Sequence, residues 1–249
     1  MKKTILMAAA AIAALASCSE PTTVKMMSYN IHNGIGLDEV TDYARIGEMI
    51  KSHNPDVVAI QEIDSATTRS EGVYVLGEIA KAAGMNDYYA PAIDYRGGKY
   101  GIGLLCKEEP ISIKRHALPG REEQRAIIIA EFPEYAFACT HLSLTEDDRN
   151  ASAEIIRSLA KEYDKPFYIA GDFNAKPESQ FIKDITTDFT PLTETTAPTF
   201  PADTPNVVID YVMSYNPNGV SVIAENPGVI DEPAMSDHRP IIVTVSIPE

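Results

Sequence analysis

Ile169-Ala170-Gly171-Asp172-Phe173-Asn174 is the stretch of sequence that is most informative about the fold. The apolar residues that lead into it, from Pro166 to Ala170, predict a buried strand, and a carboxylate and an amide follow where that strand ends. The same form, an apolar strand followed by polar side chains that can bind a metal ion or a phosphate, recurs at Ser28–His32, Ile60–Asp64, Cys139–Ser143 and Val208–Val212, and Ser236–Pro240 precedes the final predicted strand. Because strand ends on a rigid sheet hold reactive groups in place, these segments predict one shared polar site.

Hydrophobic periodicity and turn residues predict the elements between these segments. The predicted helices are Thr41–His53, Val73–Ala83, Thr145–Glu162 and Pro177–Asp184. Thr41 or Asp42 caps the first helix, Gly84 ends the second, and Thr145 with the acidic residues after it forms a capping box for the third. The predicted strands are Val24–Ile31, Asp56–Ile60, Asp87–Ile93, Gly101–Lys107, Ile111–Ala117, Arg125–Phe132, Tyr135–Leu142, Pro166–Ala170, Val207–Ser214, Val220–Ala224 and Ile241–Ile247. This order suggests stacked sheets with helices outside.

The composition is that of a soluble globular protein, and it disfavours some functions. Of the 249 residues, 45% are hydrophobic and 23% are charged, without an internal repeat, so we predict a single folded domain after the N-terminal segment. The chain has 36 Asp and Glu against 21 Lys and Arg, a formal net charge of −15. This balance disfavours a generic nucleic-acid-binding protein, because phosphate contacts need Lys and Arg, and it suits divalent cations, which need carboxylates.

The N-terminus has the form of an export signal. Lys2 and Lys3 precede an apolar run, Thr4–Ala16, which is too short to span a membrane. The run leads into Leu15-Ala16-Ser17-Cys18, which resembles the lipobox of bacterial lipoproteins, where cleavage precedes a cysteine that is then acylated. We therefore predict a signal peptide over residues 1–17, a lipidated tether over 18–23 and one domain over 24–249, anchored at Cys18 on the periplasmic or surface side of the cell envelope. The alternative is an ordinary secretory signal with a chance cysteine.

Two further cysteines lie inside the predicted domain. Cys106 and Cys139 each end an apolar run, which favours two small buried side chains. A disulfide between them stays open at this point, because a sequence does not give the geometry that such a bond requires.

The order of the polar motifs resembles that of the endonuclease/exonuclease/phosphatase superfamily, which includes pancreatic deoxyribonuclease, apurinic endonucleases, neutral sphingomyelinases and inositol polyphosphate phosphatases. An Asn follows the first strand, Gln-Glu the second, and Thr-His-Leu, Gly-Asp-Phe-Asn, Ile-Asp-Tyr and Ser-Asp-His come in order between about Val24 and Ile247. The resemblance implies a four-layer α/β/β/α sandwich of two mostly antiparallel sheets, with helices on the outer faces and the site at one end. Nothing in the sequence suggests more than a monomer.

The resemblance also implies a metal site. Glu62 would be the main ligand of Mg²⁺ or Mn²⁺, with Asn30 and Asp237 nearby, a set that agrees with the oxygen ligands these hard cations take. Asp172 and Asn174 are two residues apart, so on an extended segment they share a face. By the same resemblance, Asp172 orients or deprotonates the attacking water, and Asn174 holds water or phosphate.

A second implied pair is Asp210 and His238. The aspartate would orient the imidazole and favour its protonated form, so that His238 donates a hydrogen bond to a phosphate oxygen as negative charge develops there. His141 is the other histidine expected on the phosphate. The remaining predicted substrate contacts are Arg125, Tyr100, Phe200 and His32. Each also has an ordinary interpretation: a salt-bridging arginine, a tyrosine at the edge of the core, a turn, or a loop residue.

The sequence leaves three functions to compare. The first is a metal-dependent phosphoesterase, in which water attacks a Mg-polarised phosphoryl group of a small or lipid-linked phosphodiester or phosphomonoester. The second is a nuclease on the same scaffold, which the net charge and the absence of a basic cluster disfavour. The third is a surface lipoprotein that uses an inactive scaffold for binding. Such a copy should have lost some of the motif residues, and all of them are present here.

Overall fold

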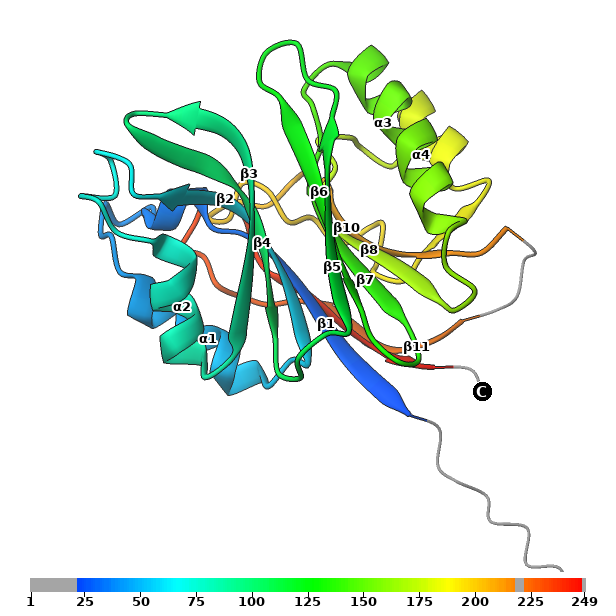
Figure 1. The fold of residues 1–249 in the computed structure, drawn as a ribbon, viewed down its shortest axis with the longest axis horizontal. Coiled ribbons are helices and arrows are strands. Elements are labelled where there is room, and N and C mark those ends of the chain that lie inside the picture. The colour runs from blue at the N-terminus through cyan, green and yellow to red at the C-terminus, as the bar shows by residue number, and fades with distance from the viewer. Residues whose placement is uncertain (1–21, 218–221, 248–249) are drawn as a thin grey trace, which may run out of the picture.

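The computed structural model describes residues 22–217 and 222–247, which form two six-stranded sheets packed face to face (Figure 1). From edge to edge, the first sheet is β11 (Ile223–Val229), β12 (Ile241–Ser246), β1 (Thr23–Asn30), β2 (Val57–Ser65), β4 (Gly98–Cys106) and β3 (Asn86–Tyr95). The second is β5 (Ser112–Leu118), β6 (Arg125–Glu131), β7 (Ala136–His141), β8 (Phe167–Asp172), β10 (Asp210–Tyr215) and β9 (Phe189–Pro191). Among these strands, β1 pairs with β2 and β7 with β8 in parallel, and the other pairings are antiparallel.

Helices cover the outer face of each sheet (Figure 1). The helices α1 (Tyr43–His53) and α2 (Val75–Ala83) pack on the first sheet, and α3 (Glu146–Ala160) and α4 (Gln180–Ile185) pack on the second. Three clusters of buried side chains fill the space between the layers. Each fully buried large aliphatic or aromatic side chain stabilises the folded state by roughly 1.5–3 kcal/mol. The predicted fold class, a four-layer α/β/β/α sandwich of two mostly antiparallel sheets, is confirmed.

The start of α1 and the end of α2 are set by neighbouring residues, as predicted, whereas the residue before α3 bonds to a distant residue. Asp42 caps α1 by accepting a hydrogen bond from the backbone N–H of Arg45, and Gly84 ends α2 in the left-handed region, both as predicted. The capping box predicted at Thr145 is wrong, because this side chain makes no cap hydrogen bond. Its hydroxyl donates instead to Glu122, 3.3 Å away, while the acidic first turn of α3 still favours the helix through its dipole.

The strands differ from prediction at a few points. β2 continues beyond its predicted end to Ser65, through an irregularity of its pairing with β4 between Ile60 and Ile63. The strand predicted from Val207 begins instead at Asp210. The short strand β9 was not predicted, because its three residues show no hydrophobic alternation. Two residues of the strand predicted from Val220 lie outside the described residues.

The parallel pairs decide where the site forms. β1 and β2 end side by side, with Asn30 opposite Gln61, and β7 and β8 end with His141 opposite Asp172. Because β10 runs antiparallel to β8, its first residue, Asp210, pairs with Asp172 at the same end. The polar residues after these strands therefore collect at one end of the sandwich.

Three remaining predictions concern cysteines and membranes. Cys106 and Cys139 are both buried and free, so the interpretation as small core side chains is confirmed. Cys18, the predicted signal peptide and most of the predicted tether lie outside the described residues. Within residues 22–217 and 222–247, no helix has the length and hydrophobicity to cross a membrane.

Candidate active site

An open cavity of about 440 Å³ lies at the end of the sandwich where the parallel strands stop. Its lining comes from both sheets and from the loops between strands: Glu62, Tyr100, Glu123, Arg125, His141, Leu144, Asp172, Asn174, Phe200, Ile209, Asp237 and His238. Two more of the predicted site residues, Asn30 and Asp210, are buried directly behind this lining and bonded to it. The structure thus brings together residues that the sequence spreads over more than 200 positions.

Glu62 is turned into the cavity by the irregularity in β2. Its φ is +64°, a left-handed conformation that is rare for a residue with a side chain and occurs at strand bulges beside functional sites. The amide of Asn30 donates to Glu62 Oε1 at 3.1 Å and to Asp172 Oδ2 at 3.2 Å. The buried Asn30 side chain therefore links a carboxylate of one sheet, Glu62, to a carboxylate of the other, Asp172.

Asp237 reaches the cavity from the loop before β12. The neighbouring Ser236 hydroxyl donates to the backbone carbonyl of Asn30 at 2.7 Å, and the backbone N–H of His238 donates to the Ser236 hydroxyl oxygen at 3.3 Å. The serine thereby fixes the loop that carries both Asp237 and His238 to the end of β1.

Asp172 lies at the centre of the site. Its Oδ2 accepts from Asn30 and lies 3.5 Å from His141 Nε2 and 3.7 Å from His238 Nε2, while Oδ1 accepts from the backbone N–H of Asn174 at 2.8 Å. Burial raises the pKa of Asp172 and the negative charge of Asp210 adds to this, although the two histidines act in the opposite direction. A carboxylate in this setting accepts a proton more readily than an exposed one.

Local backbone geometry sets the position of Asp172 and Asn174. Gly171 packs against β7 so closely that a Cβ would lie 1.9 Å from the carbonyl oxygen of Thr140, so only glycine fits there. Asn174 has a φ of +49°, and its amide donates to the carbonyl of Leu142 at 3.0 Å. The Gly-Asp-Phe-Asn motif is therefore a fixed strand end.

His238 carries a proton at neutral pH. Its Nδ1 lies 2.9 Å from Asp210 Oδ2, and this same oxygen accepts a 2.5 Å hydrogen bond from the Thr199 hydroxyl. Burial alone would lower the pKa of His238, but Asp210, through its charge and its hydrogen bond, and then Asp172 and Asp237 outweigh burial and raise it to about 10. The ring is thus a charged donor held in one orientation.

His141 is neutral at the same pH. Burial lowers its pKa to about 4, and the positive charges of Arg125 and His238 act in the same direction, against the attraction of Asp172. The cavity therefore contains one imidazolium and one neutral imidazole, each within 4 Å of the same aspartate.

Arg125 forms salt bridges and also lines the cavity, so the salt-bridging interpretation is confirmed and the substrate contact stays a prediction. It is only 6% exposed and lies 3.3 Å from Glu122 and 3.4 Å from Glu123. Glu122 is fixed by the Ser143 hydroxyl at 2.7 Å, whereas Glu123 lines the cavity. Sequence reasoning missed Glu123, although an acidic pair just before Arg125 was a signal for an ion pair.

The other predicted substrate contacts have different surroundings. Tyr100 and Phe200 both line the cavity, and the Phe200 ring lies 4.9 Å from the His238 ring. Burial raises the pKa of Tyr100, and the neighbouring Glu62 and Glu123 raise it further. His32 is not part of the lining. It begins the short 3-10 helix η1 (His32–Gly34), and its ring bonds to the carbonyl of Ile35, the residue after that helix. Its backbone N–H donates to the Asn30 side chain.

Two places in the cavity have groups that can hold a metal ion. Glu62 and Asp237 present carboxylate oxygens to the open space, which is the donor chemistry that Mg²⁺ and Mn²⁺ take. Asp172, Asp210 and His238 each offer an atom such that all three lie within 4.8 Å of one another. In that group, however, Asp210 Oδ2 already accepts two hydrogen bonds and His238 is protonated. The Glu62 side therefore fits a hard cation better.

Comparisons with known proteins agree with this arrangement. A family model described as the endonuclease/exonuclease/phosphatase family matches residues 27–238. A structure of an endonuclease/exonuclease/phosphatase from Bacteroides vulgatus has a TM-score of 0.74 at 18% identity, over 91% of this chain and 100% of that one. One from Beutenbergia cavernae has 0.74 at 17%, over 90% and 72%. A mannosyl-6-phosphatase from Bacteroides thetaiotaomicron has 0.69 at 16%, over 91% and 100%. At these identities the structures show a shared fold.

Proposed function

Since the chain belongs to the endonuclease/exonuclease/phosphatase family, we propose that it is a metal-dependent hydrolase of phosphate esters. The observation that carries the proposal is the single cavity that gathers Glu62, Asp172, Asn174, Asp237 and His238 from separate strand ends. An inactive binding protein would not need a protonated histidine, a buried carboxylate and outward-facing oxygen ligands at one place.

Different residues of this chain act on the attacking water and on the phosphate. Asp172 has a raised pKa and lines the cavity, so it accepts a proton from a water molecule that the Asn174 side chain orients. His238 donates to the phosphoryl oxygen on which charge develops, and Asp210 with Thr199 keeps its ring charged and aimed. His141 and Arg125 lie beside Asp172 and would contact the remaining phosphate oxygens.

Glu62 and Asp237 would hold the divalent cation, with the Asn30 amide orienting Glu62. When bound, Mg²⁺ or Mn²⁺ would polarise a phosphoryl oxygen and neutralise part of the charge on the phosphate. The carboxylates of Glu62 and Asp237 make this part of the cavity negative, which favours a cation before an anionic substrate binds.

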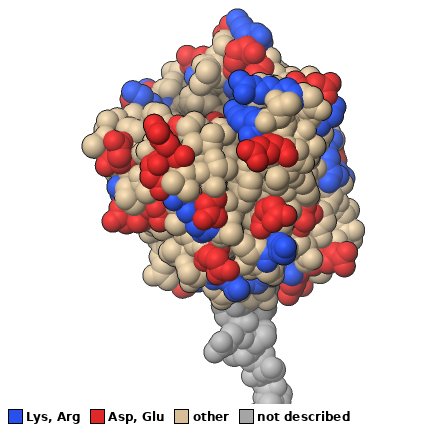
Figure 2. Space-filling model, turned by 90° about the vertical axis from the view of Figure 1, so that its left-hand side faces the viewer, with Lys and Arg blue, Asp and Glu red and all other residues tan. Residues whose placement is uncertain are grey.

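A small or lipid-linked phosphate is the substrate class we favour over nucleic acid. The chain has 36 acidic against 21 basic residues, a balance that disfavours the many phosphate contacts of a nucleic-acid backbone. On the face formed by α1, α2 and the strands beside them, acidic and basic side chains are interspersed (Figure 2). A fold relative is named as a mannosyl-6-phosphatase, so this scaffold serves a small phosphate ester in at least one case.

We also propose that acylation of Cys18 anchors the protein in the bacterial envelope, on the strength of the sequence Leu15-Ala16-Ser17-Cys18. Metabolic labelling with a palmitate analogue tests this. We expect label in the parent chain and none in Cys18→Ser, and equal labelling of both would contradict the anchor.

The activity is tested with a panel of phosphate esters. The purified protein is incubated with bis-p-nitrophenyl phosphate, sugar phosphates, phosphoinositides, sphingomyelin and plasmid DNA, in Mg²⁺, Mn²⁺ or chelator, beside His238→Ala. We expect metal-dependent turnover of a small or lipid-linked ester, lost in the variant. Nicking of DNA with no turnover of small esters would make the protein a nuclease, and turnover that persists in chelator would contradict the metal-dependent hydrolase.

A further inference from the structure

The cavity of the candidate active site has two ends that differ in chemistry. Across the sandwich, β10 packs against β12 and β4 packs against β6, while β8, which carries the central aspartate, lies between β6 and β10 in its sheet. Phe200 and Ile209 come before β10 and line one end. Tyr100 of β4, Arg125 at the start of β6 and Glu123 just before it line the other, which is the polar end of the cavity.

Glu123 brings to the polar end an acceptor that the protein leaves largely unused. Its side chain is 28% exposed, and its Oε1 lies 3.4 Å from Arg125 Nη1. Apart from this ion pair, the Glu123 carboxylate accepts no hydrogen bond from any residue in 22–217 and 222–247. Because a carboxylate has two oxygens that together accept about four hydrogen bonds, most of its capacity is open to a ligand in the cavity.

Arg125 brings a donor without a partner. The side chain is only 7% exposed, and its two Nη atoms lie 3.3 Å from Glu122 and 3.4 Å from Glu123. Its Nε is buried and has no hydrogen-bond partner in the described part of the chain. Among the described buried side chains that have such an unpartnered atom, only Arg125 lines this cavity. A buried N–H without an acceptor is unfavourable, so a ligand oxygen that accepts from it would be favoured.

A recess of about 10 Å³ continues the cavity at the polar end. It shares part of its lining with the cavity, namely Tyr100, Glu123, Arg125 and His141. The rest of its lining is small or apolar: Ala92, Gly101, Ile102 and Ala126. This volume is close to the least that one water molecule needs. The recess therefore admits a single oxygen atom and excludes a phosphate, an aryl ring or an alkyl chain.

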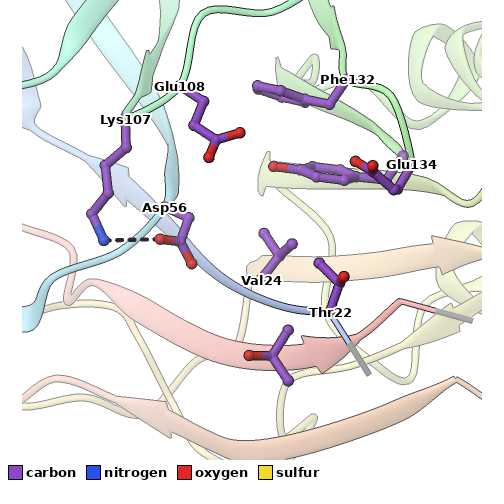
Figure 3. A pocket seen from close by; sticks show the side chains of 9 residues that line it. Thr22, Val24, Asp56, Lys107, Glu108, Phe132 and Glu134 are labelled. Atoms are coloured by element: carbon purple, nitrogen blue, oxygen red, sulfur yellow. Dashed lines mark hydrogen bonds and ion pairs between the residues drawn. The ribbon is translucent and has the colours of Figure 1, made fainter. Parts of the chain in front are cut away.

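A second cavity, of about 180 Å³, provides a contrast (Figure 3). It lies where β1 and β2 begin, at the opposite end of the sandwich. Lys107 in its lining is paired with Asp56 at 2.8 Å, and Glu108 and Glu134 are exposed, so water can hydrate them. None of its lining residues has a buried side-chain nitrogen or oxygen without a partner. Only the polar end of the active-site cavity therefore combines a recess with a buried unpartnered donor.

An open acceptor and an open donor beside one recess limit which chemical group fits there. A phosphate oxygen accepts hydrogen bonds but would be repelled by the Glu123 carboxylate, and an ammonium group donates but would be repelled by the Arg125 guanidinium. A hydroxyl is uncharged, donates one hydrogen bond and accepts others. A hydroxyl group therefore matches both residues and the volume of the recess.

We propose that the polar end is a subsite for a hydroxyl group of the substrate, which makes the substrate a phosphate ester of a polyol such as a sugar or a cyclitol. Glu123 accepts a hydrogen bond from this hydroxyl, and Arg125 Nε donates one to its oxygen. A guanidinium has five N–H donors, so Arg125 keeps its ion pairs and still has donors for the phosphate. The inference rests on the proposed function and narrows its substrate class.

The experiment compares kcat/KM of the full chain in Mg²⁺ for matched pairs of phosphate esters. Hexose 6-phosphates are paired with cyclohexylmethyl phosphate, and inositol 1-phosphate is paired with cyclohexyl phosphate. The members of a pair have six-membered rings of similar size and differ mainly in their hydroxyl groups. We expect kcat/KM of at least one polyol ester to exceed that of its partner by about 10²-fold, because a site that binds a hydroxyl rejects the analogue without it.

Variants of Glu123 test whether this residue causes the preference. Glu123→Ala should lower the ratio of kcat/KM within the pair about tenfold, since the acceptor is lost, and Glu123→Gln should lower it less, since the amide oxygen still accepts. Glu109→Ala is the control, because Glu109 is exposed and outside the cavity lining, and it should leave the ratio unchanged. Mn²⁺ binding, followed by electron paramagnetic resonance, should be the same in Glu123→Ala as in the parent chain.

Three results would overturn the inference and leave the proposed function in place. Equal kcat/KM within every pair would mean that the recess holds only water. An equal loss for both members of a pair in Glu123→Ala would mean that the residue is merely structural. Clearly weaker Mn²⁺ binding in Glu123→Ala would make Glu123 a ligand of the cation. In contrast, a parent chain that hydrolyses no phosphate ester at all, bis-p-nitrophenyl phosphate included, would overturn the proposed function itself and this inference with it.

Discussion

His141 and His238 line the same cavity and face the same aspartate, yet one is neutral and the other is charged. His141 lies 3.5 Å and His238 3.7 Å from Asp172, and both rings are almost completely buried. His141 has Arg125 as its other charged neighbour, and its pKa is lowered to about 4. His238 has Asp210 at 2.9 Å, and its pKa is raised to about 10.

This difference teaches that one further charged neighbour decides the role of a buried histidine. Burial disfavours the imidazolium in both cases, so without compensation both rings would be neutral. Asp210 supplies the compensation only at His238. The pair thus provides a charged donor and a neutral hydrogen-bonding group within 4 Å of one carboxylate oxygen, two groups that suit the acid–base chemistry proposed above.

The largest expected effect comes from removing each ring in turn. His238→Gln should lower kcat on the best substrate of the panel by about 10²–10³, since a charged donor to the developing oxyanion is lost. His141→Gln should cost about tenfold, since only a neutral donor is lost. Steady-state kinetics at pH 7.5 measures both. Equal losses would break the comparison, because the two rings would then be equivalent in the reaction.

The second effect is on the pH profile. Asp210→Asn removes the largest of the influences that raise the pKa of His238, so only Asp172 and Asp237 then oppose burial and the pKa should fall well below about 10. The ring then loses its proton at a lower pH than in the parent chain, and activity should drop on the order of 10²-fold at pH 8 but much less at pH 5. The exposed Asp203→Asn serves as the control. A profile unchanged in shape would show that Asp210 does not set the charge of His238.

The third effect sharpens where the cation binds. Glu62→Gln should weaken Mn²⁺ binding at least about tenfold, because an oxygen ligand is lost. The titration of both histidines should stay in place, because Glu62 is not among the charges that shift their pKa values. Electron paramagnetic resonance of Mn²⁺ and histidine NMR measure the two quantities. Strong loss of Mn²⁺ binding in Asp210→Asn, with little change in Glu62→Gln, would instead place the cation at Asp172, Asp210 and His238.

The last effect is on stability, which the two histidines change in different pH ranges and in opposite directions. Between pH 6.5 and about 10 the folded chain holds a proton on His238 that the unfolded chain has lost, so the free energy of unfolding falls as pH rises. Between about pH 4 and 6.5 the unfolded chain binds a proton that folded His141 does not, so the free energy falls as pH decreases. Each slope is at most about 1.4 kcal/mol per pH unit.

Urea unfolding across pH 4–10 checks these two slopes. His141→Gln should flatten the acidic limb. His238→Gln should mainly flatten the alkaline limb, with a smaller change of the acidic limb, because the charge of His238 also lowers the pKa of His141. If one substitution changed both limbs equally, the two rings would titrate as one unit and the comparison between them would no longer hold.

Much of the fold was predictable because it follows from local chemistry. Buried strands show apolar runs, Asp42 caps a helix that begins at Tyr43, and Gly84 takes the left-handed conformation that ends another. Predictions missed where a distant residue decided the outcome. Thr145 bonds to Glu122 instead of capping its own helix, and Glu123 lines the cavity from the loop before β6, beside Arg125.

The candidate site was predictable as a set of residues but not as a geometry. The resemblance of ordered motifs supplied the residues, and the structure places most of them around one cavity. The motifs could not predict the irregularity in β2 that turns Glu62 into the cavity with a φ of +64°. Nor could they predict that His32 lies outside the lining, because both features depend on how the chain folds around the strand ends.

Residue types and their order are enough to predict the alternation of apolar and polar segments, the likeness to a family and the chemical groups available. The charge state of those groups and the atoms they face follow only from the packed fold. Asn30 holds Asp172 from 142 residues away, and Asp210 sets the charge of His238 across 28 residues. Burial and Coulomb interactions depend on distance in space, so the protonation of each histidine exists only once both sheets have packed.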